Sequence, residues 1–245
     1  MNDMFHNQSG IIDPAILEKT TFGIIGVGAI GSFYAMTLAK MGAKRITIYD
    51  PDKVEEHNVA NQFYPLYCVG DAKVEALKEL IEQYSGPGIV TPIEARCSRP
   101  DGFDVIVIAV DDITTRTNIW DAINNDEDEL CRYFIDARMG AQVYRVLAID
   151  MAEQAEVDYY KATLHPKDES VPAPCTQKSI IYTVLEVAGC MLALTKQLLC
   201  NDKHPIEVMH DMAHHQFLAN HLPKKREAVT IGVQDGVAVD AEVPW

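Results

Sequence analysis

The stretch TFGIIGVGAIGSFYAMTLAKMG, residues 21–42, contains the strongest structural signal in this chain. Its apolar first residues predict a buried β-strand, and residues 29–41 predict an α-helix that ends at Gly42. A strand that runs through a glycine-rich turn into a helix is the opening unit of a Rossmann-like, doubly wound sheet. Such sheets bind ligands at the carboxyl ends of their strands, so the turn is the first candidate site.

The turn contains three glycines in the spacing G-x-G-x-x-G: Gly26, Gly28 and Gly31. The first glycine permits the tight turn, the second a close approach of the backbone to a ligand, and the third close packing of the helix on the strand. Free amides at the start of the helix favour an anionic phosphate. The candidate nucleotide-binding residues of the loop are Gly26, Gly28, Ala29, Ile30 and Gly31.

Strands alternate with helices along most of the chain. Strands are expected at 21–27, 45–50, 89–95, 103–110, 133–139 and 142–150, and helices at 14–19, 29–41, 70–85, 111–125 and 180–199. This order predicts an α/β fold with a mainly parallel sheet and right-handed crossovers. We expect one domain over residues 1–245, with a long crossover loop at about 158–179. An antiparallel C-terminal extension is expected at about 205–245, with a hairpin that turns at residues 234–236.

The composition excludes several classes of function. The net charge of −15, with no compensating basic run, argues against a nucleic acid or an anionic membrane as partner. The sequence shows no basic leader segment and no apolar run of about 18 residues, so we expect a cytoplasmic protein without a membrane span. The six cysteines form no CxxC pair, which favours reduced thiols and no structural zinc. His210 and His214 could share a helical face and bind a metal, although an exposed or interface-lining face is the stronger interpretation.

Asp50 ends the second strand, where a carboxylate can accept hydrogen bonds from a ribose diol. Together with the glycine loop it would suit NAD or any adenine nucleotide. An NAD-dependent oxidoreductase is therefore one hypothesis, and it rests on these residues alone.

The segment DPDKVEEHNVANQ, residues 50–62, favours ATP over a dinucleotide. It adds four polar candidate ligands where a dehydrogenase usually runs into its next helix: Asp52, Asn58, Asn61 and Gln62. Lys73 follows near the start of the next helix, where its ammonium could neutralise a phosphate. Without these neighbours, Lys73 would be interpreted as one exposed lysine of an amphipathic helix.

Two aspartates follow the central strand at its carboxyl end. A carboxylate there can bind Mg²⁺ that bridges ATP phosphates. Asp112 also fits the N-cap of the following helix, and Asp111 fits it less well. We therefore assign Asp111 to magnesium and Asp112 to the cap.

With these motifs in order, the chain resembles the ThiF/MoeB/HesA family, the bacterial relatives of ubiquitin-activating enzymes, from about residue 22 to residue 193. The resemblance rests on the glycine loop, Asp50/Asp52/Val54/Asn58/Gln62, Lys73, Asp111, Arg116, Cys175 and Gly189. It implies an adenylyltransferase that uses Mg-ATP to adenylate the C-terminal carboxylate of a small ubiquitin-like or sulfur-carrier protein or peptide. It also implies a homodimer, with the apolar helix at 180–199 as a candidate contact.

The resemblance assigns roles to single residues. It implies that Lys73 binds phosphate, that Asp111 binds magnesium, and that Asn58 and Gln62 orient the nucleotide or the carboxylate. Cys175 could take the acyl group as a thioester or exchange sulfur. A lone thiol without such a role is an equally weighted interpretation, because no basic neighbour closer than Lys178 would lower its pKa.

The chain departs from the family pattern at two points. Asn61 stands where the family usually has an arginine expected to contact the triphosphate, so one positive charge is lost from the site. The two CxxC pairs of many members are missing as well. Asn61 supports an alternative function, a non-catalytic ATP-binding protein that recognises a partner.

Overall fold

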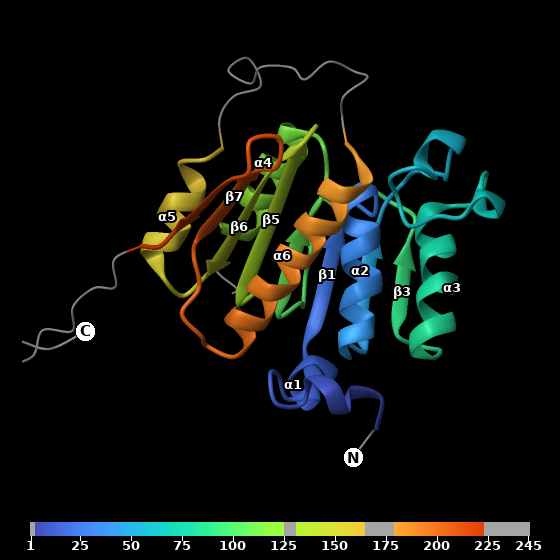
Figure 1. The fold of residues 1–245 in the computed structure, drawn as a ribbon, viewed down its shortest axis with the longest axis horizontal. Helices are drawn as coiled ribbons and strands as arrows, with labels where there is room; N and C mark the ends of the chain where they lie inside the picture. The colour runs from blue at the N-terminus through green and yellow to red at the C-terminus, as the bar shows by residue number, and fades with distance from the viewer. Residues whose placement is uncertain (1–2, 125–130, 165–178, 223–245) are drawn as a thin grey trace, which may run out of the picture.

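The computed structural model describes residues 3–124, 131–164 and 179–222 (Figure 1). Its strands are β1 (Thr21–Ile25), β2 (Arg45–Tyr49), β3 (Val90–Ile93), β4 (Val105–Ile108), β5 (Tyr133–Gly140), β6 (Val143–Asp150), β7 (Glu207–Asp211) and β8 (Gln216–Asn220). Its α-helices are α1 (Pro14–Lys19), α2 (Ala29–Met41), α3 (Lys73–Ser85), α4 (Ile113–Asn124), α5 (Gln154–Lys161) and α6 (Ile181–Leu199). Short 3-10 turns are η1 (Asp3–Gln8), η2 (Glu56–Asn58) and η3 (Leu66–Cys68).

The strands of the described residues form one 8-stranded sheet in the order β3-β2-β1-β4-β5-β6-β7-β8. The pairs from β3 to β5 are parallel, and those from β5 to β8 are antiparallel. The predicted α/β class, a mainly parallel doubly wound sheet with an antiparallel C-terminal part, is confirmed. β1 lies between β2 and β4, so the loops that follow these three strands meet at one edge, which we call the carboxyl edge.

Helices cover both faces of the sheet. Figure 1 shows α2, α3 and α6 on the near face, with α4 behind the sheet. The buried side chains of β4 alternate between two cores: Val105 and Val107 pack with α2, α3 and α6, whereas Ile106 and Ile108 pack with α4 and α5. This period of two explains why β4 is apolar at every position, as a central parallel strand buried on both faces must be.

Local signals in the sequence place several helix ends as expected. Asp13 caps α1 by accepting a hydrogen bond from the Ala15 amide, with proline at the first helical position. α2 runs over the predicted residues and ends at Gly42, whose φ of 120° favours glycine. Asp112 caps α4, since its Oδ2 accepts hydrogen bonds from the amide and the hydroxyl of Thr115 at 2.7 and 2.9 Å.

Three expectations for the second half of the chain need correction or fall outside the description. The loop expected from residue 158 begins later, because α5 continues to Lys161 and buries Val157 and Tyr160. His210 and His214 do not share a helical face, because residues 207–220 form the hairpin of β7 and β8. The hairpin expected to turn at residues 234–236 lies outside the described residues.

α6 is the one helix of the described chain that is long and apolar enough, by length and composition, to cross a membrane. This differs from the expectation that no apolar run is long enough. Its inward positions, among them Val187, Met191 and Leu194, are buried in the same core as α2 and the sheet. A core helix meets the same length and composition criteria, and the packing of α6 fits that explanation.

Gly31 offers a test of how tightly α2 packs on β1. A Cβ atom at this position would lie 1.9 Å from the carbonyl oxygen of Gly26, which is backbone and cannot rotate away. We expect Gly31→Ala to lower the free energy of unfolding by about 3 kcal/mol, as overpacking of a close contact does. Urea denaturation followed by circular dichroism measures this change.

Gly189→Ala is the matched control in α6, because a Cβ there meets no atom within 4 Å. We expect this variant to gain roughly 0.5–1 kcal/mol from the better helix propensity of alanine. Equal stability of the two variants would contradict the close packing of α2 on the glycine loop.

Candidate functional site

The glycine loop leaves an open space at the start of α2. Gly26 has a φ of 86° and its amide donates to the Tyr49 carbonyl at 2.8 Å, which fixes the turn to β2. Gly28 is the N-cap of α2 and gives no side-chain cap, and a Cβ built on it would meet no atom within 4 Å. A helix N-terminus with free amides and open space in front of it suits a phosphate. Ala29 and Ile30 contribute backbone there, since the Ile30 side chain is buried in the core.

Asp50 lies beneath this loop. Its Oδ2 accepts a hydrogen bond from the Val27 amide and its Oδ1 one from the Asp52 amide, both at 2.9 Å. Burial raises the pKa of the Asp50 carboxyl, and the Lys73 ammonium and the two amides partly offset that rise. The structure therefore gives Asp50 a clear task within the protein, which is to fix the loop to the end of β2.

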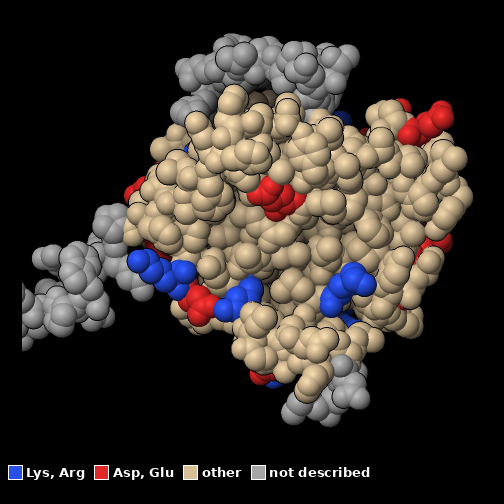
Figure 2. Space-filling view, viewed as in Figure 1, with Lys and Arg blue, Asp and Glu red and all other residues tan. Residues whose placement is uncertain are grey.

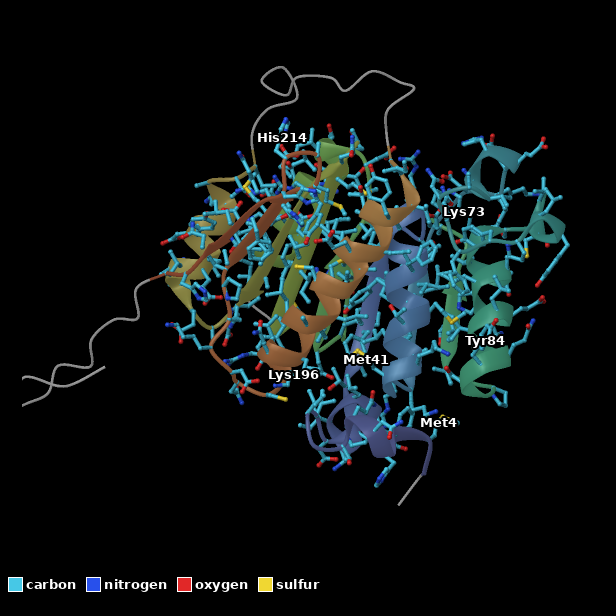
Figure 3. All side chains as sticks on the ribbon, viewed as in Figure 1. Met4, Met41, Lys73, Tyr84, Lys196 and His214 are labelled. Carbon is cyan, nitrogen blue, oxygen red and sulfur yellow. The ribbon has the colours of Figure 1, made fainter. Side chains whose placement is uncertain are left out.

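Lys73 joins the two aspartates. Its Nζ lies 3.0 Å from Asp52 Oδ2 and 4.0 Å from Asp50 Oδ1. The lysine is buried, whereas 63% of the Asp52 side chain is exposed, so the ion pair reaches from the interior to the surface of the carboxyl edge. Figure 3 shows Lys73 at the start of α3, beside the upper end of α2.

The polar residues predicted after Asp52 separate into different environments. Asn58 is buried, and its Oδ1 accepts a hydrogen bond from the Glu55 amide at 2.9 Å as part of a capping box, so it shapes the turn. Asn61 donates from Nδ2 to the hydroxyl of Ser179. Gln62 has a buried Oε1 with no hydrogen-bond partner in the part of the chain that the structure describes.

Two further contacts that the sequence reasoning missed fix this segment to the glycine loop. The hydroxyl of Tyr64 donates to the Val27 carbonyl at 2.7 Å, and the amide of Phe63 donates to Ser32 Oγ at 3.0 Å. No periodicity or motif pointed to these residues. A tyrosine and a serine become informative only when the fold brings them together.

Asp111 lies in the turn between β4 and α4 and is exposed. The residues on either side of it are fixed. Arg116 donates to the Val110 carbonyl, and the Asp112 carboxylate caps α4. This leaves the Asp111 carboxylate at the surface of the carboxyl edge, where a bound ion could reach it.

Arg116, predicted only as a basic residue of the family pattern, is buried beneath that turn. It pairs with Asp136 of β5 and donates to the Ala137 carbonyl at 2.9 Å. Asp136 also pairs with Arg138 at 2.8 Å and accepts a hydrogen bond from the Tyr160 hydroxyl at 3.0 Å. Burial lowers the pKa of Arg116 to about 10, so the arginine stays protonated near neutral pH. No motif or spacing in the sequence pointed to this network.

The remaining candidates are a thiol and a metal. Cys175 lies outside the described residues. Among the residues that are described, no group of three or more His, Cys, Asp or Glu side chains is arranged to hold a metal ion. Mg²⁺ in nucleotide sites commonly uses one or two carboxylates together with phosphate oxygens and water, so Asp111 could serve without such a cluster.

The open turn at Gly28, the cationic Lys73 and the exposed Asp111 follow three neighbouring strands. This arrangement fits a nucleotide with its phosphates at the start of α2. The family model of the ThiF family matches residues 13–230 of the chain. The chain belongs to the ThiF family.

Curated relatives match over parts of the ThiF chain. The tRNA threonylcarbamoyladenosine dehydratase of Bacillus subtilis is 41% identical over 66 residues, which are 26% of each protein. Ubiquitin-like modifier-activating enzyme 5 of Caenorhabditis briggsae is 31% identical over 41% of this chain and 23% of its own. The adenylyltransferase and sulfurtransferase MOCS3 of Aedes aegypti is 29% identical over 47% of this chain and 28% of its own. The matches thus span about a quarter of the length of these relatives.

Solved structures agree on the ThiF fold. Escherichia coli MccB with ATP superposes with a TM-score of 0.69 at 16% identity, over 90% of this chain and 72% of that one. PaaA superposes with a TM-score of 0.66 at 18% identity, over 89% and 68%. Identities this low support the shared architecture alone.

The Lys73 ion pairs predict a pH-dependent loss of stability. We expect Lys73→Met to lower the free energy of unfolding by about 3 kcal/mol near neutral pH, because it leaves Asp50 buried without its cation. The folded-state pKa of Asp50 then rises further above its unfolded value. A carboxyl group shifted in this direction costs stability in full above its folded pKa. The cost shrinks as the pH falls from the folded pKa towards the lower unfolded pKa, below which it is absent.

Urea denaturation at about pH 7.5 and about pH 5 measures this difference, which should be smaller at the lower pH. Lys78→Met, in the same helix and half-buried, is the control and should change little at either pH. A deficit for Lys73→Met that stays constant with pH would contradict the role of the Asp50 charge.

Proposed function

We propose that this ThiF protein adenylates the C-terminal carboxylate of a small ubiquitin-like or sulfur-carrier protein or peptide, with ATP as co-substrate. The observation that carries the proposal is the placement of an open glycine turn, a buried lysine and an exposed aspartate along one carboxyl edge. Support comes from the names of relatives, a ubiquitin-like modifier-activating enzyme and an adenylyltransferase, and from the ATP-bound structure of MccB.

The proposed reaction needs positioning and charge more than acid-base chemistry. A carboxylate oxygen of the substrate attacks the α-phosphorus of ATP, the bond to the β-phosphate oxygen breaks, and pyrophosphate leaves. Both reactants are anions, so the enzyme must hold them together and screen their repulsion. We assign the phosphates to the amides of residues 28–31, at the start of α2, and to Lys73. Asp50 and Asp52 orient Lys73 and are proposed to lie on the side of the site that faces the ribose.

Asp111 is the proposed ligand of Mg²⁺. The ion would supply charge that neutralises the phosphates, as a hard cation bound through a carboxylate and phosphate oxygens does. Asp111 is exposed, and its neighbour Asp112 is held in place as the cap of α4, which supports this role. Asn58, by contrast, is proposed to act through the turn that it caps. Gln62 is proposed to act through its Oε1, which is buried and has no hydrogen-bond partner among the described residues.

A second step at Cys175 is proposed from the resemblance alone. The thiolate would attack the carbonyl of the activated carboxylate and release AMP, and a thioester would form. We further propose that residues 1–245 form a single nucleotide-binding domain that works in the cytoplasm.

A homodimer is proposed through the face that carries α6. Figure 2 shows that this face is mostly free of Lys, Arg, Asp and Glu, although the chain has a net charge of −15. Ile181, Tyr182 and Leu185 are 38%, 41% and 53% exposed along α6. A weakly charged apolar face is where two acidic copies can meet with the least repulsion.

A non-catalytic ATP-binding protein that recognises a partner is the second candidate. The observation that favours it is the neutral Asn61, whose amide is engaged by Ser179 and brings no positive charge toward the phosphates. This candidate predicts ATP binding without turnover.

Pyrophosphate exchange distinguishes the two candidates. With ATP, Mg²⁺, labelled pyrophosphate and a short synthetic peptide ending in Gly-Gly, the protein should return label to ATP only when the peptide is present. Asp111→Asn should reduce this exchange by roughly a hundredfold or more, as loss of a group that stabilises developing charge does. Asp121→Asn, an exposed aspartate of α4, should leave the rate unchanged. ATP binding by calorimetry with no exchange, for Gly-Gly peptides and for intact small carriers, would favour the non-catalytic candidate.

The dimer is tested by one charge on α6. Leu185→Glu places a carboxylate in the proposed contact, and we expect a monomer in light scattering where the unmodified protein gives a dimer. Val69→Glu, on the turn after η3 and 43% exposed, should leave the dimer intact. A monomeric unmodified protein, or a dimer that tolerates Leu185→Glu, would exclude this face.

A further inference from the structure

Asn61 links two segments that are far apart in the sequence. It follows η2, and its backbone amide donates to the Asn58 carbonyl at 3.2 Å. Its side-chain Nδ2 donates to Oγ of Ser179, 118 positions later. Ser179 directly precedes Ile180, the N-cap of α6. The hydrogen bond therefore joins the loop after β2 to the start of α6.

Both partners are attached to the body of the protein. On the side of Asn61, the following residues Phe63 and Tyr64 bind Ser32 and Val27 of the glycine loop and α2. On the other side, Ser179 forms a parallel bridge with Ala141, in the turn between β5 and β6. The Asn61–Ser179 contact thus connects the glycine loop with the turn that ends β5 and with the start of α6.

The rest of the Asn61 side chain is poorly suited to bind a nucleotide. Its Oδ1 is buried and has no hydrogen-bond partner among the described residues, so neither polar atom of the amide is free toward solvent. The side chain is also neutral, and a neutral amide gives phosphate much less stabilisation than a lysine or arginine does.

We propose that Asn61 and Ser179 form a positioning pair, which holds the start of α6 against the loop after β2 and so sets the approach of the carboxylate substrate. Asn61 does not contact the nucleotide. The part that concerns the carboxylate rests on the proposed function, whereas the structural link does not.

Three variants test the pair: Asn61→Ala, Ser179→Ala and the double variant. In calorimetry with Mg-ATP, each should bind ATP within about twofold of the unmodified protein. In pyrophosphate exchange with the Gly-Gly peptide, each single variant should raise the KM for peptide roughly three- to tenfold, the range for loss of one hydrogen bond, and leave the KM for ATP unchanged. The double variant should be no worse than either single variant, because both remove the same contact.

Ser179→Thr is the conservative control, since it keeps the hydroxyl and should restore the peptide KM. Three results would overturn the proposal: additive effects in the double variant, weaker ATP binding in Asn61→Ala but not in Ser179→Ala, or no rescue by threonine. The second result would make Asn61 a nucleotide ligand.

Hydrogen exchange keeps the test independent of the proposed function. We expect the first turn of α6, residues 181–185, to exchange faster by a similar factor in Asn61→Ala and Ser179→Ala and at the normal rate in Ser179→Thr. Unchanged exchange in both alanine variants would overturn the structural link. If the unmodified protein binds no ATP or shows no pyrophosphate exchange, the proposed function fails, and this measurement still decides whether the pair exists.

Discussion

The carboxyl edge depends on one buried carboxylate. Asp50 accepts hydrogen bonds from the Val27 and Asp52 amides and lies 4.0 Å from the Lys73 ammonium, so it joins the glycine loop, the end of β2 and the start of α3. A charge buried in this way is costly unless it is paired, and the position of Lys73 follows from that requirement. The lysine is therefore held in place without any ligand, which would lower the ordering cost of the phosphate binding proposed for it.

Much of the fold could be predicted because its signals are local. The glycine turn, the cap at Asp13, the stop at Gly42 and the apolar run of β4 each act through neighbours in the chain. The segment from His210 to His214 shows where prediction from local signals fails. Its spacing suits a helix, but the residues pair with β6 and β8 instead, and a strand order fixed by distant partners leaves no local trace.

The candidate site divides in the same way. Lys73 and Asp111 could be singled out from the sequence, because Asp111 follows a predicted strand and Lys73 lies near the start of a predicted helix. What could not be predicted is which polar residues form hydrogen bonds or ion pairs with other groups of the protein. Asn58 forms a capping box with Glu55, and Arg116 forms an ion pair with Asp136 of β5. Both contacts depend on the folded conformation, which the motif spacing did not reveal. The sequence therefore predicted which end of the sheet the candidate side chains lie at better than the contacts that each of them makes.

β5 has a consequence for motion. The strand pairs in parallel with β4 and antiparallel with β6, and its residues 133–136 take part in both pairings. The parallel part of the sheet (β3 to β5) and its antiparallel part (β5 to β8) therefore share one strand and cannot rotate against each other as rigid bodies without breaking backbone hydrogen bonds. Any opening and closing at the carboxyl edge must then come from its loops and helix ends, where small shifts cost little, and not from a hinge between the two parts of the sheet.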